Sequence, residues 1–423
     1  MSKKILLYVL LFFSFTSLIP QCSKRELLCA ILKQDNIILN NTNEIIDILN
    51  TVDCNTNVIP ISQADVPYTI TVPGHYCLTE NIVVGAGQDA ITINLDAVVD
   101  NQTVLNLNNY AIIGLNGGVT SGRNGIVAVS TAPPPFIFPL SLKIINGTIA
   151  AMVEHGIYIP FGLGALSIDT ITTNSCGFSG SPTGGSIVVG NDTQILFSPV
   201  ITNCDILGSS TDYGLLMINP LNYFIAHTLI SSNGRDALRI TNPAGPSTGI
   251  ISMCSAVGNG GDGFVTTDEN DCTFRDCIAT ENSGSGFNII GTGAILNECQ
   301  ALSNRANGFR ISADNTVLIE CSATHNTSSG FSLITNSTVV SECNAISNQN
   351  DGFTINGNNN QLRDNTATSN STFGFNLAAG SGNRIYSNFA NNNSGGNYSG
   401  SITNVAVSPV PADPINFTTN IED

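Results

Sequence analysis

NRANGF at residues 304–309 and NTSSGF at residues 326–331 are two copies of a hexapeptide that decides the fold of this chain. Further copies are NGGDGF from Asn259, NSGSGF from Asn282, NQNDGF from Asn348, NSTFGF from Asn370 and a degenerate NSGGNY from Asn393. Successive copies begin 23, 22, 22, 22, 22 and 23 residues apart. A fixed period of this length indicates stacked structural units that bury their apolar side chains against one another.

The segment before each hexapeptide has the alternation of a β-strand. In VLIECSA at residues 317–323, we expect Val317, Ile319, Cys321 and Ala323 to face inward. The Phe that ends each hexapeptide begins a second strand, as in GFRIS at residues 308–312. Each repeat therefore holds two or three short strands, separated by Asn, Gly, Asp and Ser.

Equivalent residues of successive repeats predict columns, with one side chain contributed by each coil. The aromatic column comprises Phe264, Phe287, Phe309, Phe331, Phe353, Phe375 and Tyr398. The cysteine column comprises Cys254, Cys277, Cys299, Cys321 and Cys343, and it extends upstream through Gly147, Cys176, Cys204 and Thr228. The first Asn of each hexapeptide should lie at a bend that tolerates left-handed backbone, where stacked amides can hydrogen-bond from coil to coil.

These patterns predict an all-β parallel solenoid with coils of about 22 residues. A helical solenoid would need apolar residues at three- and four-residue spacing, which does not recur, and Gly, Asn, Thr and Ser are poor helix formers. Like residues should lie above one another at the spacing of neighbouring strands, about 4.8 Å.

The chain resembles the right-handed, single-stranded parallel β-helix proteins of the pectin-lyase-like superfamily, with repeats of the type found in carbohydrate-binding proteins and sugar hydrolases. The resemblance runs from about Tyr68 to Tyr398, and includes PGHYCL at Pro73–Leu78 and NGTI at Asn146–Ile149. It implies that the coils start near residue 68. It implies no single activity, because the superfamily includes lyases, hydrolases, phage tailspikes, adhesins and a periplasmic copper-site maturation protein.

The N-terminus has the features of a secretory signal peptide over residues 1–21: Lys3 and Lys4 precede an apolar run from Ile5 to Ile19. We therefore expect a secreted, extracytoplasmic or cell-surface protein with no transmembrane segment. Gln21 departs from a bacterial lipoprotein box, so a lipid anchor at Cys22 is the less favoured alternative. The net charge of -17 argues against nucleic-acid partners and anionic membranes.

Outside the repeats, residues 22–56 are expected to form a short helical cap, residues 57–398 the β-helix and residues 399–423 a C-terminal tail or cap. The helical signal lies within residues 25–52 and alternatively serves oligomerisation. The column cysteines should remain free thiols, because side chains in register point the same way. The disulfide candidates are Cys22, Cys29, Cys54 and Cys77.

One column of carboxylates is a candidate cation site. It consists of Asp276, Glu298, Glu320, Glu342 and Asp364, each immediately before the cysteine column or its Asn successor. Like charges about 4.8 Å apart should raise pKa values or attract cations such as calcium. The alternative is a solvated acidic face. No other cofactor is expected.

A second set of carboxylates, Asp212, Asp236 and Asp262, is the candidate catalytic group, with Arg235 beside it. Stacked carboxylates suit glycoside hydrolysis, and an Arg near acids suits β-elimination from a uronate. The alternative is structural, because Ser285, Asn307, Ser329 and Asp351 fill the same turn position in other coils, and such turns favour Asp, Asn and Ser.

Tyr158, Tyr213 and Tyr223 are the candidate ligand-binding residues, since exposed aromatic rings bind sugars and the chain has no Trp. We expect an exported, non-catalytic β-helix scaffold for surface recognition, with polysaccharides or cell-surface glycans as partners. Two alternatives stay open. One is a polysaccharide lyase or glycoside hydrolase, and the other is a structural adhesin or spike that forms trimers through its N-terminal segment.

Overall fold

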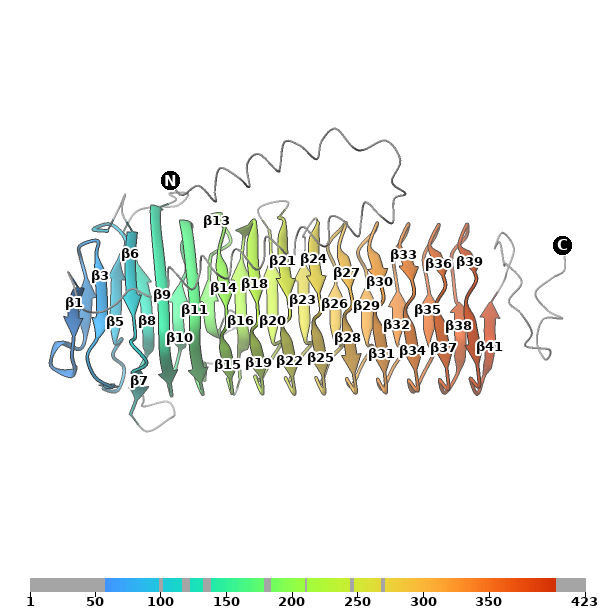
Figure 1. The fold of residues 1–423 in the computed structure, drawn as a ribbon, viewed down its shortest axis with the longest axis horizontal. Helices are drawn as coiled ribbons and strands as arrows, with labels where there is room; N and C mark the ends of the chain where they lie inside the picture. The colour runs from blue at the N-terminus through green and yellow to red at the C-terminus, as the bar shows by residue number, and fades with distance from the viewer. Residues whose placement is uncertain are drawn as a thin grey trace, which may run out of the picture. The chain divides into compact units, whose positions relative to one another are not determined.

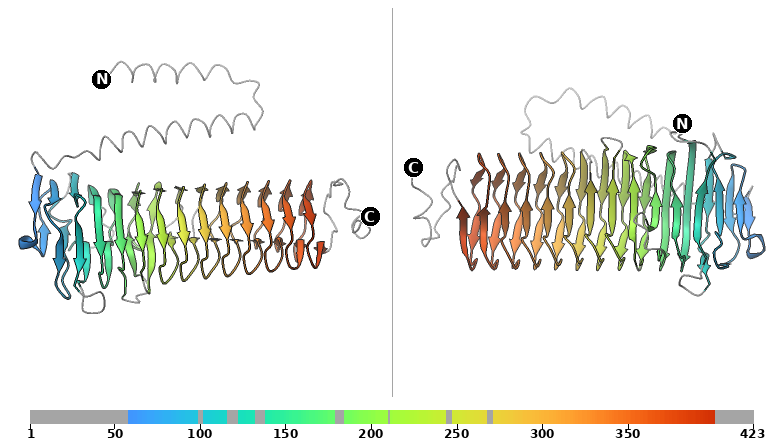
Figure 2. Two further views of the ribbon diagram at one scale, coloured as in Figure 1. Left: turned by 60° about the horizontal axis from the view of Figure 1, so that its bottom comes forward. Right: turned by 180° about the vertical axis from the view of Figure 1, so that it is seen from behind.

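The computed structural model describes residues 58–98, 102–115, 122–131, 138–178, 184–209, 211–243, 247–267 and 271–400. The chain divides into two compact units, Met1–Thr56 and Asn57–Asp423. The expected signal peptide, the helical cap, Cys22, Cys29 and Cys54 lie outside the described residues. The second unit is a parallel β-helix whose coils stack along one axis (Figures 1 and 2).

One face of the β-helix, here called face A, is a 14-stranded parallel sheet with one strand from each coil. Its strands, in order, are β2 Tyr68–Ile70, β5 Ile91–Asn94, β8 Asn124–Val129, β10 His155–Ile159, β12 Gly185–Val189, β16 Tyr213–Ile218, β20 Leu238–Thr241, β23 Phe264–Thr267, β26 Phe287–Ile289, β29 Phe309–Ile311, β32 Phe331–Leu333, β35 Phe353–Ile355, β38 Phe373–Leu377 and β41 Gly396–Gly400.

The other two faces belong to one 25-stranded sheet that bends around a corner. Face B carries β14 Val200–Thr202, β18 Tyr223–Ala226, β21 Gly249–Ser252, β24 Cys272–Arg275, β27 Ile295–Asn297, β30 Val317–Ile319, β33 Val339–Ser341, β36 Gln361–Arg363 and β39 Arg384–Tyr386. Face C carries β15 Asp205–Leu207, β19 Leu229–Ser231, β22 Ser255–Val257, β25 Ile278–Thr280, β28 Gln300–Leu302, β31 Ser322–Thr324, β34 Asn344–Ile346, β37 Thr366–Thr368 and β40 Phe389–Asn391.

The long strands β9 Phe138–Ala150 and β11 Leu163–Asn174 run through the corner and pair with both faces. Before them come β1 Val58–Ile61, β3 His75–Leu78, β4 Ile82–Val84, β6 Gln102–Asn106 and β7 Ala111–Gly114. A separate pair joins β13 Leu196–Phe197 to β17 Pro220–Leu221. The described residues contain one short 3-10 helix, Gln63–Asp65. The first strand thus begins at Val58, before the start that the resemblance implies.

Buried asparagine amides connect the coils in a ladder. Its members are Asn233, Asn259, Asn282, Asn304, Asn326, Asn348, Asn370 and Asn393. Each Nδ2 donates to the Oδ1 of the next member at 2.9–3.0 Å, and the same Oδ1 accepts the preceding backbone N–H at 3.0–3.1 Å. The second proton of the Asn326 amide goes to the carbonyl of Ala301 at 3.0 Å. The left-handed residue is the one before each Asn, such as His325, and not the Asn itself.

The aromatic column is confirmed. From Phe287 to Phe375 the rings of neighbouring coils stack with centroids 4.7–4.8 Å apart and planes within 6°. The Gly before each Phe lets the next coil approach: a Cβ on Gly308 would lie 2.7 Å from the carbonyl oxygen of Gly330 and 2.8 Å from the Cβ of Ala323. The Gly-Phe pair, present in six of the seven copies, therefore combines close coil contact with ring stacking.

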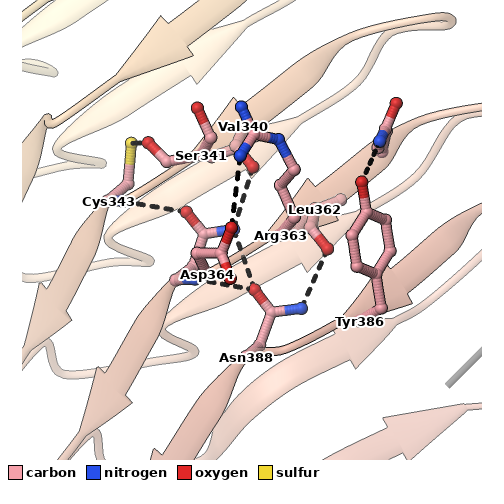
Figure 3. A network of polar contacts seen from close by, with 10 residues as sticks. Val340, Ser341, Cys343, Leu362, Arg363, Asp364, Tyr386 and Asn388 are labelled. Carbon is pink, nitrogen blue, oxygen red and sulfur yellow. Dashed lines mark hydrogen bonds and ion pairs between the residues drawn. The ribbon is translucent and has the colours of Figure 1, made fainter. Parts of the chain in front are cut away.

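The cysteine column is also confirmed for Cys254 to Cys343, whose thiols are buried and free. Downstream, the column continues as amides: Asn365 donates to the Oδ1 of Asn388 at 2.9 Å, around the group drawn in Figure 3. Upstream, Cys176 is not a member, because β11 places Ile171 opposite Gly147 and Asp205 opposite Thr172. Cys77 is disulfide-bonded, as expected of one of the disulfide candidates.

The inward positions expected around Cys321 are wrong in part. Leu318 is fully buried, whereas Val317 and Ile319 lie on the outer surface of face B. The reason is Glu320, which adopts left-handed backbone (φ 55°) at the bend between faces B and C. A single such residue shifts the alternation by one position, so the pattern cannot be followed through the bend.

Replacing Asn326 by Ala should cost about 3 kcal/mol or more of the free energy of unfolding, because the buried N–H and Nδ2 of Asn304 lose their shared acceptor and the carbonyl of Ala301 loses its donor. Urea unfolding followed by circular dichroism measures this change. The matched control Asn356→Ala, at an exposed position, should change it by less than about 0.5 kcal/mol. Equal effects of the two variants would contradict the ladder's role.

Burial raises the pKa of the Cys176 and Cys204 thiols to about 12. Both should therefore resist iodoacetamide at about pH 8 in the folded protein and react after unfolding in guanidinium chloride, because the thiolate is the reactive form. Peptide mapping by mass spectrometry distinguishes these two cysteines from the others. Modification of either one in the folded protein would be the contrary result.

Candidate functional site

The three candidate catalytic aspartates do not form one column. Asp236 and Asp262 occupy equivalent positions before β20 and β23, since Leu238 pairs with Phe264. Asp212 is one residue out of step: Leu215 pairs with Leu238, which aligns Asp212 with Arg235. The expected stack of three carboxylates is therefore a stack of two.

The carboxylates also point in different directions. A Cβ on Gly184, in the preceding coil, would lie 2.5 Å from Oδ2 of Asp212. The carboxylate of Asp236 is instead directed at Gly261 of the following coil, and that of Asp262 at Gly284 of the coil after it. Asp212 and Asp236 thus face away from each other, toward opposite ends of the β-helix, and do not converge on a common point as an acid and base pair requires.

Both oxygens of the two stacked carboxylates already accept hydrogen bonds. In Asp236, Oδ1 accepts the backbone N–H of Asp262 at 2.8 Å and Oδ2 accepts Nε–H of Arg239 at 2.8 Å. In Asp262, Oδ1 accepts the N–H of Ser285 at 2.5 Å and Oδ2 accepts the Asn288 amide at 2.8 Å. Each side chain joins one coil to the next and holds an outward residue of face A.

The same arrangement recurs far from this region. Oδ1 of Asp351 accepts the N–H of Phe373 at 3.1 Å, and its Oδ2 accepts the Asn376 amide and the Thr354 hydroxyl, both at 2.8 Å. The structural interpretation, a turn position that favours Asp, Asn and Ser, accounts for Asp236, Asp262 and Asp351 together.

Burial raises the pKa of Asp236 above its ordinary value, and the guanidinium of Arg239 opposes the shift. The residue is 7% exposed. A buried carboxylate whose charge is balanced by one Arg and one backbone N–H is a structural ion pair, and removing one partner would leave the other without compensation.

The outer surface of face A carries a second apolar cluster, opposite the core side of the sheet. Val188, Leu216 and Ile218 form it, and the half-buried rings of Tyr158 and Tyr213 pack against it. The strand register places Tyr158 beside Val188 and Val188 beside Leu216. Two of the three ligand-binding candidates therefore lie together on one face.

Charged and aromatic groups surround this cluster. The ring of His155 stacks on Tyr158 with centroids 4.4 Å apart, and its Nδ1 lies 2.8 Å from the carbonyl oxygen of Gly185. Burial lowers the pKa of His155. The guanidinium carbons of Arg235 and Arg239 lie 5.1 Å and 5.4 Å from the centre of the Tyr213 ring, within cation–π distance.

Tyr223, the third ligand-binding candidate, is a core residue and not an exposed one. It is 2% exposed and belongs to the main hydrophobic core. Gly249 in the next coil leaves the space that its ring occupies. Its position as the first residue of β18 points it inward, opposite to the outward Phe224.

The carboxylate column at the bend between faces B and C is exposed, one residue per coil, as expected. All five members have left-handed backbone, with φ between 51° and 57°. Partial burial and the neighbouring Glu298 raise the pKa of Asp276. Arg363 pairs with Asp364 at 3.2 Å, as Figure 3 shows. Within the described ranges, no group of three or more His, Cys, Asp or Glu side chains is arranged to hold a metal ion.

Sequence reasoning missed part of the face A cluster. Arg239, Val188, Leu216 and His155 are not among the candidate residues named from the sequence. The available signal was the segment YGLLMI of β16, where apolar residues fill both the inward and the outward positions. A strand that is apolar on both sides is covered on both sides.

The stability difference between the wild type and Asp236→Asn should depend on pH. The folded-state pKa of Asp236 lies above its unfolded value of about 3.9, so the stability from its protonation is fully present below the unfolded pKa and is lost as pH rises through the folded pKa. The wild type should gain stability relative to Asp236→Asn between about pH 7 and about pH 4. Urea midpoints at the two pH values measure this gain, and a constant difference would be inconsistent with a raised pKa.

Comparison with known proteins agrees with this architecture. Residues 139–301 match the family model described as a right handed beta helix region. No curated protein sequence matches the chain. Among the described residues, no helix has the length and apolar character that a membrane span requires.

Three solved structures show the extent of the structural likeness. The periplasmic alginate epimerase AlgG is 11% identical over 83% of this chain and 84% of its own, with a TM-score of 0.47. The catalytic domain of a GH87 alpha-1,3-glucanase is 11% identical over 78% and 68%, with a TM-score of 0.49. The A-module of the mannuronan C-5 epimerase AlgE4 from Azotobacter vinelandii is 13% identical over 83% and 89%, with a TM-score of 0.42. The chain is a parallel β-helix, and its function has to be argued from its own residues.

Proposed function

We propose that this protein is an exported, non-catalytic recognition scaffold that binds glycans on the outer surface of face A. The observation that carries the proposal is the engagement of two of the three candidate catalytic carboxylates: both oxygens of Asp236 and of Asp262 accept hydrogen bonds from the β-helix itself. A general acid or base needs an oxygen that can reach a substrate proton. These side chains instead hold adjacent coils together.

The surface around Tyr158 and Tyr213 has the chemistry of a sugar-binding site. The half-buried rings suit the C–H faces of a pyranose, and the buried apolar cluster beneath them supports them. The guanidinium groups of Arg235 and Arg239 donate hydrogen bonds that suit sugar hydroxyls. The two arginines also fix the orientation of the Tyr213 ring.

The charge of the molecule favours a neutral glycan. The net charge is -17, and Arg239 is already paired with Asp236 at 2.8 Å. A polyanion such as a polyuronate would be repelled over most of the surface. A neutral oligosaccharide bound through ring contacts and hydrogen bonds would bind with little dependence on salt.

A glycan array followed by calorimetry on the best neutral oligosaccharide tests the proposal with the mature protein, residues 22–423. Tyr158→Ala and Tyr213→Ala should each weaken binding by about tenfold or more, since each removes an aromatic contact surface. The control Phe389→Ala removes an exposed ring from β40, on another face, and should leave the affinity unchanged.

Two results would contradict the proposal. Binding that tolerates both Tyr substitutions would remove face A as the site. Release of reducing ends or unsaturated uronates from a polysaccharide panel, abolished in Asp236→Asn, would favour the lyase or hydrolase alternative instead.

A further inference from the structure

The outer surface of face B carries an apolar stripe. Its members are the outward residues of seven consecutive coils: Val200, Phe224, Ile250, Thr273, Ile295, Val317 and Val339. Six of the seven are apolar. Ile250 is 37% exposed and Ile295 is 41% exposed, and the remaining members are partly exposed. Their inward neighbours, such as Ile251 and Leu318, are fully buried, so the core does not need the stripe.

The stripe has definite limits. Beyond Val339 the same row continues with Gln361 and Arg384, which are polar and charged. At this end Gln361 donates to the hydroxyl of Tyr386. Figure 3 shows Arg363 paired with Asp364 nearby. Six coil intervals of about 4.8 Å give the stripe a length of about 29 Å. Apolar surface that is continuous and ends abruptly indicates an interaction surface.

Acidic side chains border the stripe. At the bend with face C, one acid lies beside each stripe member from Thr273 to Val339. These acids are Asp276, Glu298, Glu320 and Glu342. At the opposite border, Asp271 and Asp314 precede β24 and β30. The part of the strip from Thr273 to Val339 therefore has carboxylates at both borders, and the left-handed backbone holds these four acids of the column at a fixed spacing. Beside Val200, Phe224 and Ile250 the bend carries Asn203, His227 and Met253 instead.

We propose that face B docks a protein partner through a segment that presents an apolar stripe bordered by lysine or arginine. A partner helix of about 20 residues would span about 30 Å and match the strip in length. Its apolar side would cover Ile250, Ile295 and Val317, and its basic residues would pair with the carboxylate column. This surface is separate from the glycan site on face A, and the proposal does not depend on that site.

Charge complementarity distinguishes this occupant from two others. A second copy of the chain would bring its own carboxylate borders against those of the first, because both edges of face B carry acids, and like charges at close range are unfavourable. An anionic lipid surface would be repelled for the same reason. A cationic segment turns both borders into attractive contacts.

The test uses the full-length mature protein and two designed helical probe peptides of about 20 residues, one of leucine and lysine and one of leucine and glutamate. Fluorescence anisotropy measures binding. The leucine–lysine peptide should bind and the leucine–glutamate peptide should not. The stripe variant Ile250→Thr, Ile295→Thr, Val317→Thr should weaken binding by about tenfold or more. Threonine is a good strand former, so the fold should be retained, and circular dichroism checks this.

The matched control changes three outward apolar residues of face C: Ile278→Thr, Leu302→Thr, Ile346→Thr. These residues flank the same carboxylate column on the face C side, outside the stripe. Binding should therefore stay within about twofold of the wild type. For the charges, Glu298→Gln, Glu320→Gln, Glu342→Gln should weaken binding more than the equal loss of charge in Asp192→Asn, Asp205→Asn, Glu281→Gln.

Three results would overturn the proposal. Equal weakening by the two charge variants would mean that net charge alone attracts the peptide, and equal weakening by the face B and face C variants would mean that the stripe is not the binding surface. Failure of the leucine–lysine peptide to bind would rule out a basic, apolar helical segment as the occupant. Self-association of the wild type in light scattering, abolished by the stripe variant, would identify a second copy as the occupant instead.

Discussion

Hydrogen bonding between identical side chains of successive coils is the interaction on which this structure depends. A ladder asparagine such as Asn326 uses every polar group of its amide: one Nδ2 proton goes to Asn348, the other to the carbonyl of Ala301, and its Oδ1 accepts two bonds from Asn304. A buried amide with all partners satisfied costs little, whereas a missing partner costs the full desolvation of the group. The ladder therefore fixes the register of each coil on the next, and the stacking of the Phe rings follows from that register.

The same constraint decides what the carboxylates can do. A parallel β-helix offers an unpaired backbone N–H at each turn, and an Asp one coil above can accept it, as Asp236 accepts the N–H of Asp262. The second oxygen then turns outward to a neighbour on face A. Repeated acidic residues such as Asp236, Asp262 and Asp351 are thus explained by coil-to-coil bonding, and the proposed recognition function rests on the surfaces instead. Face A offers rings and guanidinium groups, and face B an apolar strip between acids.

The sequence allowed the columns to be predicted because the repeat period is constant from Asn259 onward. Phe309 lies on Phe331 for this reason. Prediction was wrong where one residue shifts the inward–outward alternation of a strand or the alignment of one coil with the next. Left-handed Glu320 turned Val317 outward, and this hid the stripe of face B. Unequal coil lengths upstream misplaced Cys176, and the extra residue before β16 separated Asp212 from Asp236.

Paired electron spins on the outer surface of face B provide the most direct test of the stacked-coil account. Spin labels attached through Ile250→Cys and Arg384→Cys lie six coils apart in one row, so the account predicts a single distance peak at about 29 Å, with a width set by the label linkers. The buried thiols of the cysteine column should remain unlabelled. A broad distribution of spin–spin distances, or a distance that differs from this value by about 10 Å or more (two coil spacings), would contradict the account.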